Sequence, residues 1–536
     1  MRSSQLIRRM ACIILFFPLG LLLAPAAGRA QATNNAAPPP AKPAPKPVPA
    51  PPRQQGQQKV LPPAQRAQPG ANQALVKAAG GRVTQAATQA AQATKTVAAK
   101  PLNGVRQLAA RAGGGPDPAG LKMPPNARSV ALPGGGARIV HPDGRRWEMD
   151  DSNHVRAYSR PGMQAKFNGD GRLSSLQLNR PYGNMTVTRS LAGERQTVSM
   201  RPGGVRVVTF GRDRGYMERP FAGHMGYVQR TYVVGGRSYA RVYRPYRYRG
   251  VVYYRYVPAH YYDPRFYGWV SRPWPGRVAY NWGWRPAPWY RFYGGYFAPT
   301  PAYPTGALWL TDFLLAANLK LAYQNYQEFE QGNASVPQPE GSGSVTAGLS
   351  PEVKDAIAQE VQREVEEEQA AAGQPGGSPA TPGSQTLPPA LDPNERTFVV
   401  SQNLDVPAGS EACALTPGDI IYRTGDSPTA DNKVGVNILA SKAGDCPANT
   451  PTQVEVATLQ EMHNQFREQI DTGLSTLATS EGKGGLPSGP AAGPRPDPEG
   501  SAPPDHDVEA MLTQDQRDAN AAEADATNAA NSVASM

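Results

Sequence analysis

Residues that commonly carry catalysis or bind metals are scarce in this sequence of 536 residues. It has three cysteines and six histidines. No histidine lies about three to five residues from another histidine or a cysteine, a spacing that zinc sites show. The Gly-x-Ser-x-Gly elbow, the His-Glu-x-x-His motif and the phosphate-binding loop are also missing. We therefore expect no catalytic residues, no metal site, no cofactor and no enzymatic activity.

Apolar runs long enough to span a membrane are missing too, and the first apolar run has a different explanation. Residues 1–32 begin with Arg2, Arg8 and Arg9, continue with the apolar run 11–23 and end in small residues. This order is typical of a secretory signal peptide. The run is shorter than the roughly 20 residues of a spanning helix. We expect export to the periplasm, the outer surface or the medium, and no spanning helix after cleavage.

Removal of that leader leaves Cys413 and Cys446 as the remaining cysteines. In an oxidising compartment they are expected to pair, and such a bridge contributes roughly 3–4 kcal/mol in the loop-entropy estimate. Two free buried thiols are the alternative.

Proline and glycine are abundant instead, with 56 and 55 residues respectively. This excess excludes one compact enzyme core and indicates low-complexity segments between smaller folded parts. We expect the following order: signal peptide 1–32, disordered Pro/Ala-rich stalk 33–133, β-meander 134–215, Tyr/Arg/Trp-rich β and loop region 216–330 with a closing helix, linker 331–394 with an acidic helix 350–369, small β module 395–480 with a helix 458–478, and disordered tail 481–536.

Turn signals recur through residues 134–215 at intervals of about 8 to 13 residues, close to the spacing of an antiparallel meander. The unit Phe167-Asn168-Gly169-Asp170-Gly171-Arg172-Leu173 and the looser copy 141–146 resemble the tyrosine/aspartate (YD, or RHS-type) repeats of bacterial surface proteins. The resemblance covers residues 137–214. It implies a hairpin-rich surface scaffold, often one associated with carbohydrate or with a shell.

Arginine and aromatic residues alternate in the next region. From Phe167 to Leu319 there are 21 arginines and no lysine, and residues 216–303 hold 18 of the 23 tyrosines. Rows of rings and guanidinium groups suit stacking on sugar or base faces, but such ladders also stabilise a thin sheet, and both interpretations stay open. The candidate ligand platform is Tyr243, Arg244, Tyr246, Arg247, Tyr254, Arg255, Tyr256, Trp269, Trp274, Trp282, Trp284 and Trp289.

Three helices are predicted. The apolar helix at 306–326 packs in a core, or alternatively on a membrane surface or in a partner groove. Ser350 and Pro351 start the acidic helix 350–369, whose glutamates predict a solvated face. Thr458 and Glu461 suggest a capping box for the helix 458–478, on which His463 is expected at the surface or at an edge.

The fold class expected is mainly β with long disordered segments. It combines an antiparallel hairpin meander, an irregular Tyr/Arg/Trp-rich region, three helices and a small disulfide-stapled β-barrel or sandwich with a C-terminal helix. The segment 415–419 is similar to the entry turn of bacterial SH3-like barrels.

The formal net charge of +12 is unevenly distributed. Residues 121–300 carry 29 basic and 9 acidic side chains, whereas 301–536 carry 11 and 33. These blocks could engage each other, so we do not expect a uniformly basic protein that binds nucleic acid.

The sequence favours a non-enzymatic exported envelope or surface protein of structural or interaction type. A glycan-binding module for peptidoglycan or acidic polysaccharide is the alternative, and an envelope hydrolase is less favoured. The partner expected is an anionic envelope glycan or another envelope protein.

Overall fold

The computed structural model describes residues 124–133, 135–211, 214–234, 236–332, 348–373, 387–409 and 411–534. The expected signal peptide 1–32, most of the stalk 33–133 and much of the linker lie outside the described residues.

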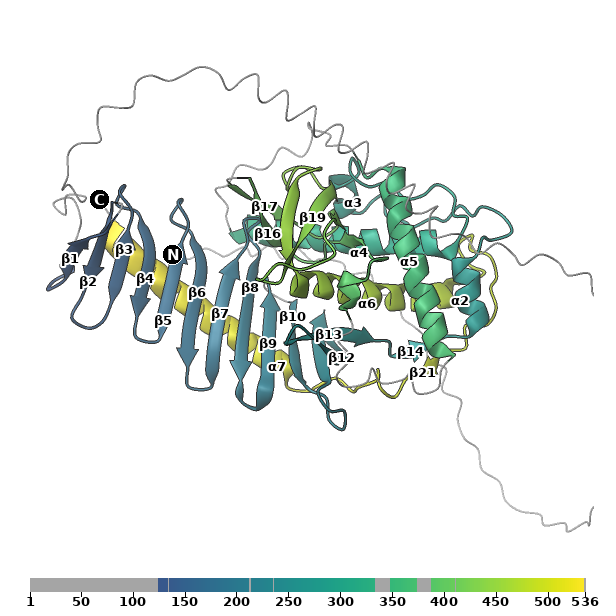
Figure 1. The fold of residues 1–536 in the computed structure, drawn as a ribbon, viewed down its shortest axis with the longest axis horizontal. Coiled ribbons are helices and arrows are strands. Elements are labelled where there is room, and N and C mark those ends of the chain that lie inside the picture. Colours follow the sequence, from purple (N-terminus) through teal and green to yellow (C-terminus); the bar gives the residue numbers. More distant parts are fainter. Residues whose placement is uncertain are drawn as a thin grey trace, which may run out of the picture. The chain divides into compact units, whose positions relative to one another are not determined.

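One antiparallel sheet of 13 strands follows the chain order without a crossover (Figure 1). Its strands are β1 Arg128–Ala131, β2 Ala137–Val140, β3 Arg146–Met149, β4 Val155–Arg160, β5 Met163–Phe167, β6 Leu173–Arg180, β7 Gly183–Arg189, β8 Arg195–Arg201, β9 Val205–Phe210, β10 Arg214–Pro220, β11 Val228–Val234, β12 Arg237–Tyr248 and β13 Val251–Val257. The meander is confirmed, but the expected boundary between residues 215 and 216 falls inside β10. The meander and the first part of the Tyr/Arg-rich region are therefore one sheet.

The predicted Asp-Gly-Arg turns share one geometry. Gly144 and Gly171 have positive φ angles of 91° and 77°, which glycine adopts without steric cost. The preceding aspartates accept a hydrogen bond from the backbone N–H two residues on, Asp143 from Arg145 at 3.0 Å and Asp170 from Arg172 at 3.1 Å. These local bonds explain why the chain reverses at each copy of the motif.

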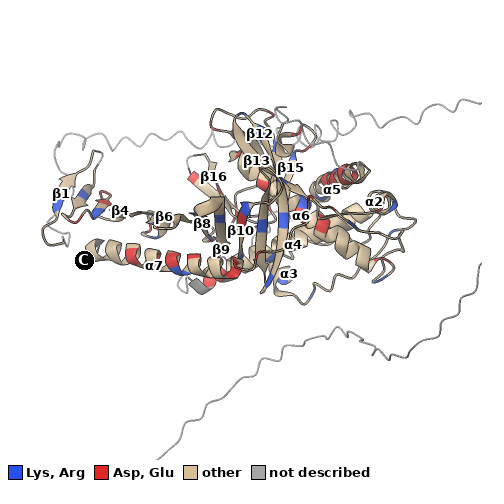
Figure 2. Cartoon of the chain, turned by 90° about the horizontal axis from the view of Figure 1, so that it is seen from below, with Lys and Arg blue, Asp and Glu red and all other residues tan. Residues whose placement is uncertain are grey.

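The two faces of the sheet differ in their cover. Helix α7, Val508–Ala534, lies along one face, which we call the α7 face (Figures 1 and 2). Apolar side chains of that face, such as Trp147, Leu176 and Val187, are at most 1% exposed. Helix α6, Val456–Ser480, contacts the last strands from the opposite side, which we call the α6 face.

Helix α7 corrects the prediction of a disordered tail over 481–536. Its buried residues Ala519, Ala522, Ala526 and Ala530 recur every three or four positions and pack on the α7 face. Alanine favours helix, and its small side chain lets the helix approach the large rings of the sheet. The composition of the tail favours disorder, and only the spacing of its alanines indicates a helix that packs on the sheet.

Acidic residues of α7 pair with arginines of the sheet (Figure 2). Asp515 is fully buried and accepts from Arg180 at 2.9 Å and from Arg201 at 2.6 Å. Asp525 pairs with Arg160 at 2.8 Å. The basic and acidic blocks of the sequence thus contact each other within one chain.

A second layer of structure is helical and aromatic. It contains α2 Pro264–Ser271, α3 Pro288–Phe292, α4 Gly306–Gly332 and α5 Pro351–Ala372. With α6 and α7, the described residues hold six α-helices where three were expected. The aliphatic side of α4 lies in the core formed with the aromatic loops. Core packing is therefore the interpretation of this helix that the structure bears out.

Helix α5 begins as predicted, with Ser350 as N-cap and Pro351 in the first turn. The predicted solvated acidic face is only partly correct, because Glu366 and Glu367 are exposed, whereas Glu360, Glu364 and Glu368 are at most 8% exposed. Arg467 of α6 donates to Glu364 at 2.6 Å. The three glutamates recur every four residues and so form one stripe. In it, Glu364 and Glu368 face Arg467 of α6, and Glu360 pairs with Arg363 of α5.

The expectation for the C-terminal module was a small β-barrel or sandwich, and the structure has not a closed barrel but an open sheet of four strands with a separate hairpin. Its order is β15 Thr397–Val399, β18 Ile420–Arg423, β19 Lys433–Ala440 and β20 Pro451–Glu455, with a separate hairpin β16 Leu404–Ala408 and β17 Glu411–Leu415. Helix α6 starts at Val456, and Thr458 does not cap it, since Glu455 is the N-cap residue. A further pair, β14 His260–Tyr261 with β21 Arg495–Pro496, anchors the segment that leads to α7.

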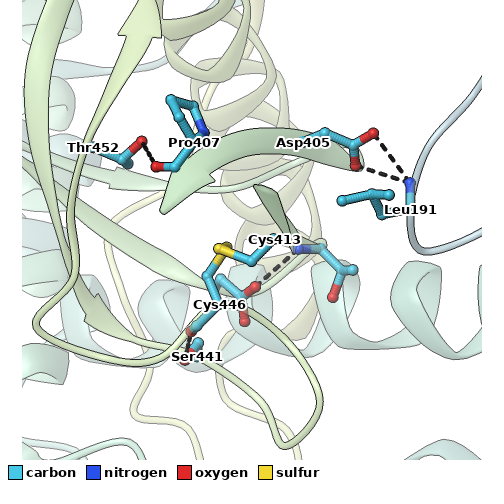
Figure 3. The surroundings of a disulfide bond; sticks show 9 residues. Leu191, Asp405, Pro407, Cys413, Ser441, Cys446 and Thr452 are labelled. Atoms are coloured by element: carbon cyan, nitrogen blue, oxygen red, sulfur yellow. Dashed lines mark hydrogen bonds between the residues drawn. A yellow bond between two sulfur atoms is a disulfide. The ribbon is translucent and has the colours of Figure 1, made fainter. Parts of the chain in front are cut away.

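The Cys413–Cys446 disulfide is present and joins β17 to the loop after β19 (Figure 3). Next to it, Cys446 N–H donates to Ala414 O at 2.8 Å and Ser441 Oγ donates to Cys446 O at 2.6 Å. On β16, the strand paired with β17, Asp405 accepts from the Leu191 N–H of the meander at 2.9 Å (Figure 3). The staple thus holds the hairpin that contacts the loop between β7 and β8.

Candidate binding site

A hollow of about 600 Å³ lies between the α6 face of the sheet and the first half of α6. Strands β8 to β13 supply one wall, and residues 455–465 supply the other. Concave sites of this size with a few convergent polar groups are the usual places for small ligands.

A row of aromatic rings crosses the strands of the wall. Phe210, Tyr216, Tyr232 and Tyr239 come from four neighbouring strands, β9 to β12, and line the hollow. Their ring centroids are 6.3, 5.2 and 5.2 Å apart in that order. Tyr239, at the end of the row, is 41% exposed. The register of the strands creates this row, because Tyr216 is opposite Tyr232 and Tyr232 is opposite Tyr239.

Arg230 forms the floor of the hollow. It is 4% exposed, and its guanidinium donates to Glu218 at 2.6 Å and to both carboxylate oxygens of Glu461 at 2.6 and 3.2 Å. The guanidinium also lies over the Tyr243 ring, 4.1 Å from its centroid. Burial opposes ionisation of Glu461, but the Arg230 charge lowers the pKa of Glu461 below its usual value. The floor is therefore an ion pair whose two charges compensate each other.

The charges that line the hollow balance. Arg206, Arg214 and Arg230 are matched by three glutamates, Glu194, Glu455 and Glu461. Arg214 is 3.1 Å from Glu194, so its charge is also compensated nearby. The remaining polar groups include the amides of Gln196, Gln402, Gln460, Asn464 and Gln465. A neutral ligand with many hydroxyl or amide groups matches this lining better than a polyanion.

The tyrosines of the predicted platform do not form an open surface. Tyr243 and Tyr256 are at most 2% exposed, and their hydroxyls donate to Glu468 and Asp471 of α6. Tyr246 donates to Gln460 at 2.7 Å. Of this group, Tyr254 alone lines the hollow. Here the rings join the sheet to α6, the structural alternative that the sequence left open.

The arginines of the platform separate as well. Arg255 pairs with Glu367 of α5 at 3.2 Å. Arg244 is half-buried, and Arg247 is exposed. None of the three lines the hollow.

The tryptophans of the platform belong to another part of the molecule. Trp274 and Trp289 are 6% and 7% exposed, and Trp282 and Trp284 stack with centroids 4.2 Å apart. All four lie in or against the aromatic core around α4. Trp269 and Trp274 also line a shallower depression. The structure therefore separates the predicted platform into tyrosines that join the sheet to α6 and tryptophans that lie in or against the core around α4.

The residues of the hollow that the sequence analysis missed are mainly Arg206, Tyr216, Arg230, Tyr232 and Tyr239. Each lies on an alternate position of its strand, so the face they share was visible in principle. Their meeting with Glu461 depends on how α6 crosses the sheet, and no local pattern contains that information. From the sequence alone, Glu461 is instead predicted to belong to a capping box.

A second cluster brings Glu364, Glu395 and His463 within 4.8 Å of one another. His463 is 1% exposed and lies 2.5 Å from Glu395, so its prediction as a surface or edge residue is wrong. Arg467 at 2.6 Å and Arg363 at 3.2 Å engage the same Glu364 carboxylate. Burial raises the pKa of Glu364, but the charges of these cations lower it more, to about 2. We read the cluster as a salt-bridge network rather than a metal site, because cations already compensate its carboxylates.

Comparison of the chain with protein-family models, curated proteins and solved structures gives no match. No helix in the described ranges has both the length and the apolar character that crossing a membrane requires.

Proposed function

We propose that this chain is an exported cell-envelope or surface protein of structural and interaction type, without enzymatic activity, that binds a glycan in the hollow on the α6 face. The observation that carries the proposal is the combination of a tyrosine wall, convergent amides and balanced charge in one concavity. Sugars present apolar ring faces and many hydroxyls, which aromatic rings and amides match.

The balance of charge narrows the ligand class. Arg230 and Arg214 are engaged by carboxylates within 3.1 Å. An acidic polysaccharide or a nucleic acid would have to displace these partners. We therefore favour the uncharged sugar backbone of peptidoglycan, as distinct from its charged stem peptides, over acidic polysaccharide. Export rests on the leader of residues 1–32.

Retention on purified peptidoglycan and on an acidic polysaccharide, each in low and high salt, tests this function. We expect retention on peptidoglycan that salt does not weaken, because screening acts on charge pairing. Tyr239→Ala should reduce the affinity about fivefold, equivalent to roughly 1 kcal/mol for one aromatic contact. Phe292→Ala is the matched control, since Phe292 is 38% exposed and lies outside the hollow. If neither polymer retains the chain, the proposal is overturned.

A further inference from the structure

The α6 face continues beyond the hollow as an open polar surface. On strands β4 to β6, no described element covers this face in the way that α7 covers the other, whereas the hairpin of β16 contacts the loop between β7 and β8 (Figure 2). Two rows of cross-strand partners run over it. The first row is Ser159, Gln164, Gln177 and Thr186. The second row is Lys166, Ser175, Thr188 and Gln196.

The second row leads into the hollow. Gln196, its last member, is itself a lining residue, and its cross-strand partner is Phe210. The first row runs beside the second and is followed in register by Val198 and then by Val208, which is fully buried. The second row and the aromatic wall of the hollow are therefore one continuous surface that runs across the strands.

The chemistry of the rows is uniform. Seven of the eight side chains are amides or hydroxyls, and Lys166 is the one charged member. Gln164, Lys166, Gln177 and Thr188 are exposed, and the other four side chains are half-buried. Neighbouring strands lie about 4.8 Å apart, so the face repeats its hydrogen-bonding groups at a short, regular interval along the direction of the rows.

We propose that these rows bind a linear, uncharged, β-linked polysaccharide that lies across β4 to β8 and ends in the hollow. The inference rests on the proposed function and extends it from a pocket for a few sugars to a site for a polymer. A β-1,4-linked pyranose chain is extended, and its repeat of one ring is close to the strand spacing. Each sugar can therefore meet a new strand.

A second copy of this chain is the competing occupant, and the composition of the face argues against it. Stable interfaces between identical chains have a markedly apolar centre. The rows have no large apolar side chain until Val198, at the entrance to the hollow. Their amides and hydroxyls would lose water without gaining apolar contact.

Affinity measured against chain length tests the inference. The probes are β-1,4-linked N-acetylglucosamine oligosaccharides of two and six units, titrated calorimetrically into the full chain. We expect the longer probe to bind at least about tenfold more tightly, because only it reaches from the hollow onto the rows.

The double variant Gln164→Ala/Gln177→Ala should remove about tenfold of affinity for the longer probe and leave the shorter one unchanged. Both glutamines are exposed, so the fold should not be affected. The matched control is Gln453→Ala, an exposed glutamine in β20 of the other sheet.

The outcomes separate the two proposals. Equal affinity for the two probes, with both still sensitive to Tyr239→Ala, overturns the extended site and leaves the hollow as the glycan site. Binding of neither probe, nor of peptidoglycan, overturns both proposals. A dimer that the double variant dissociates, seen by light scattering, overturns the polysaccharide as occupant in favour of a second copy.

Discussion

Replacement of Asp515 by alanine tests how α7 is held on the sheet. The carboxylate is fully buried and accepts from Arg180 at 2.9 Å and from Arg201 at 2.6 Å. D515A leaves both guanidiniums without this partner, and the Arg180 guanidinium stays buried, because its side chain is only 5% exposed. Removal of one member of a buried pair costs about 3–5 kcal/mol. We expect the lower end, because Arg180 keeps a second carboxylate, Asp518, at 2.7 Å.

Hydrogen exchange of the α7 amides is the appropriate assay, since the lost interaction holds one helix and opening of α7 can precede global unfolding. A loss of about 3 kcal/mol corresponds to exchange roughly 150-fold faster. The matched control on the same helix is D525A, whose pair with Arg160 is 38% and 46% exposed. Exposed pairs contribute about 0–1 kcal/mol, so D525A should accelerate exchange less than about fivefold. Equal exchange in D515A and D525A would refute the assignment of Asp515 as the anchor.

Three further predictions concern stability. C413S should lower the free energy of unfolding by roughly 3–4 kcal/mol, measured by urea denaturation, with no further loss when reductant is added. Burial raises the pKa of Glu360, Glu368 and Glu468 to about 7 from 4.5. The contribution of these protonated carboxyls to stability is therefore complete below about pH 4.5 and is lost as the pH rises through about 7. The melting temperature should be lower at about pH 8 than at about pH 5, and a higher melting temperature at the alkaline pH would contradict this. N464A should lower the free energy of unfolding by about 1–3 kcal/mol. The Asn464 amide accepts from and donates to the backbone of β13 at 3.1 and 2.9 Å, and the substitution leaves those backbone groups unpaired. Unchanged hydrogen exchange of the β13 amides would count against this prediction.

The meander could be predicted from the sequence because its information is local. Turn residues with positive φ, such as Gly171, and alternating strands between them determine each hairpin before any distant contact forms. Ser350 as a helix start is local in the same sense. The disulfide followed from elimination, since two cysteines remain when the expected leader is set aside.

The hollow could not be predicted in the same way, because it forms where elements distant in the chain cross. Arg230 and Glu461 are separated by 231 positions. A glutamate at the start of a helix looks like a capping residue until the sheet beneath it is known. His463 and the glutamates of α5 mislead for the same reason, since charged residues are buried when partners from other elements neutralise them.

The absence of lysine from the strands around the hollow has a structural explanation. Arg230 contacts Glu218 and Glu461 through three nitrogens and still presents its plane to the Tyr243 ring at 4.1 Å. An ammonium group has neither the planar fork nor the face to do both. A sheet with so little aliphatic core on its α6 face therefore uses arginine to join rings to carboxylates. Because Arg214 and Arg230 already have carboxylate partners, the groups left for a ligand in the hollow are the amides, the hydroxyls and the exposed Tyr239 ring. Under the proposed function, this lining matches a neutral polymer better than an anionic one.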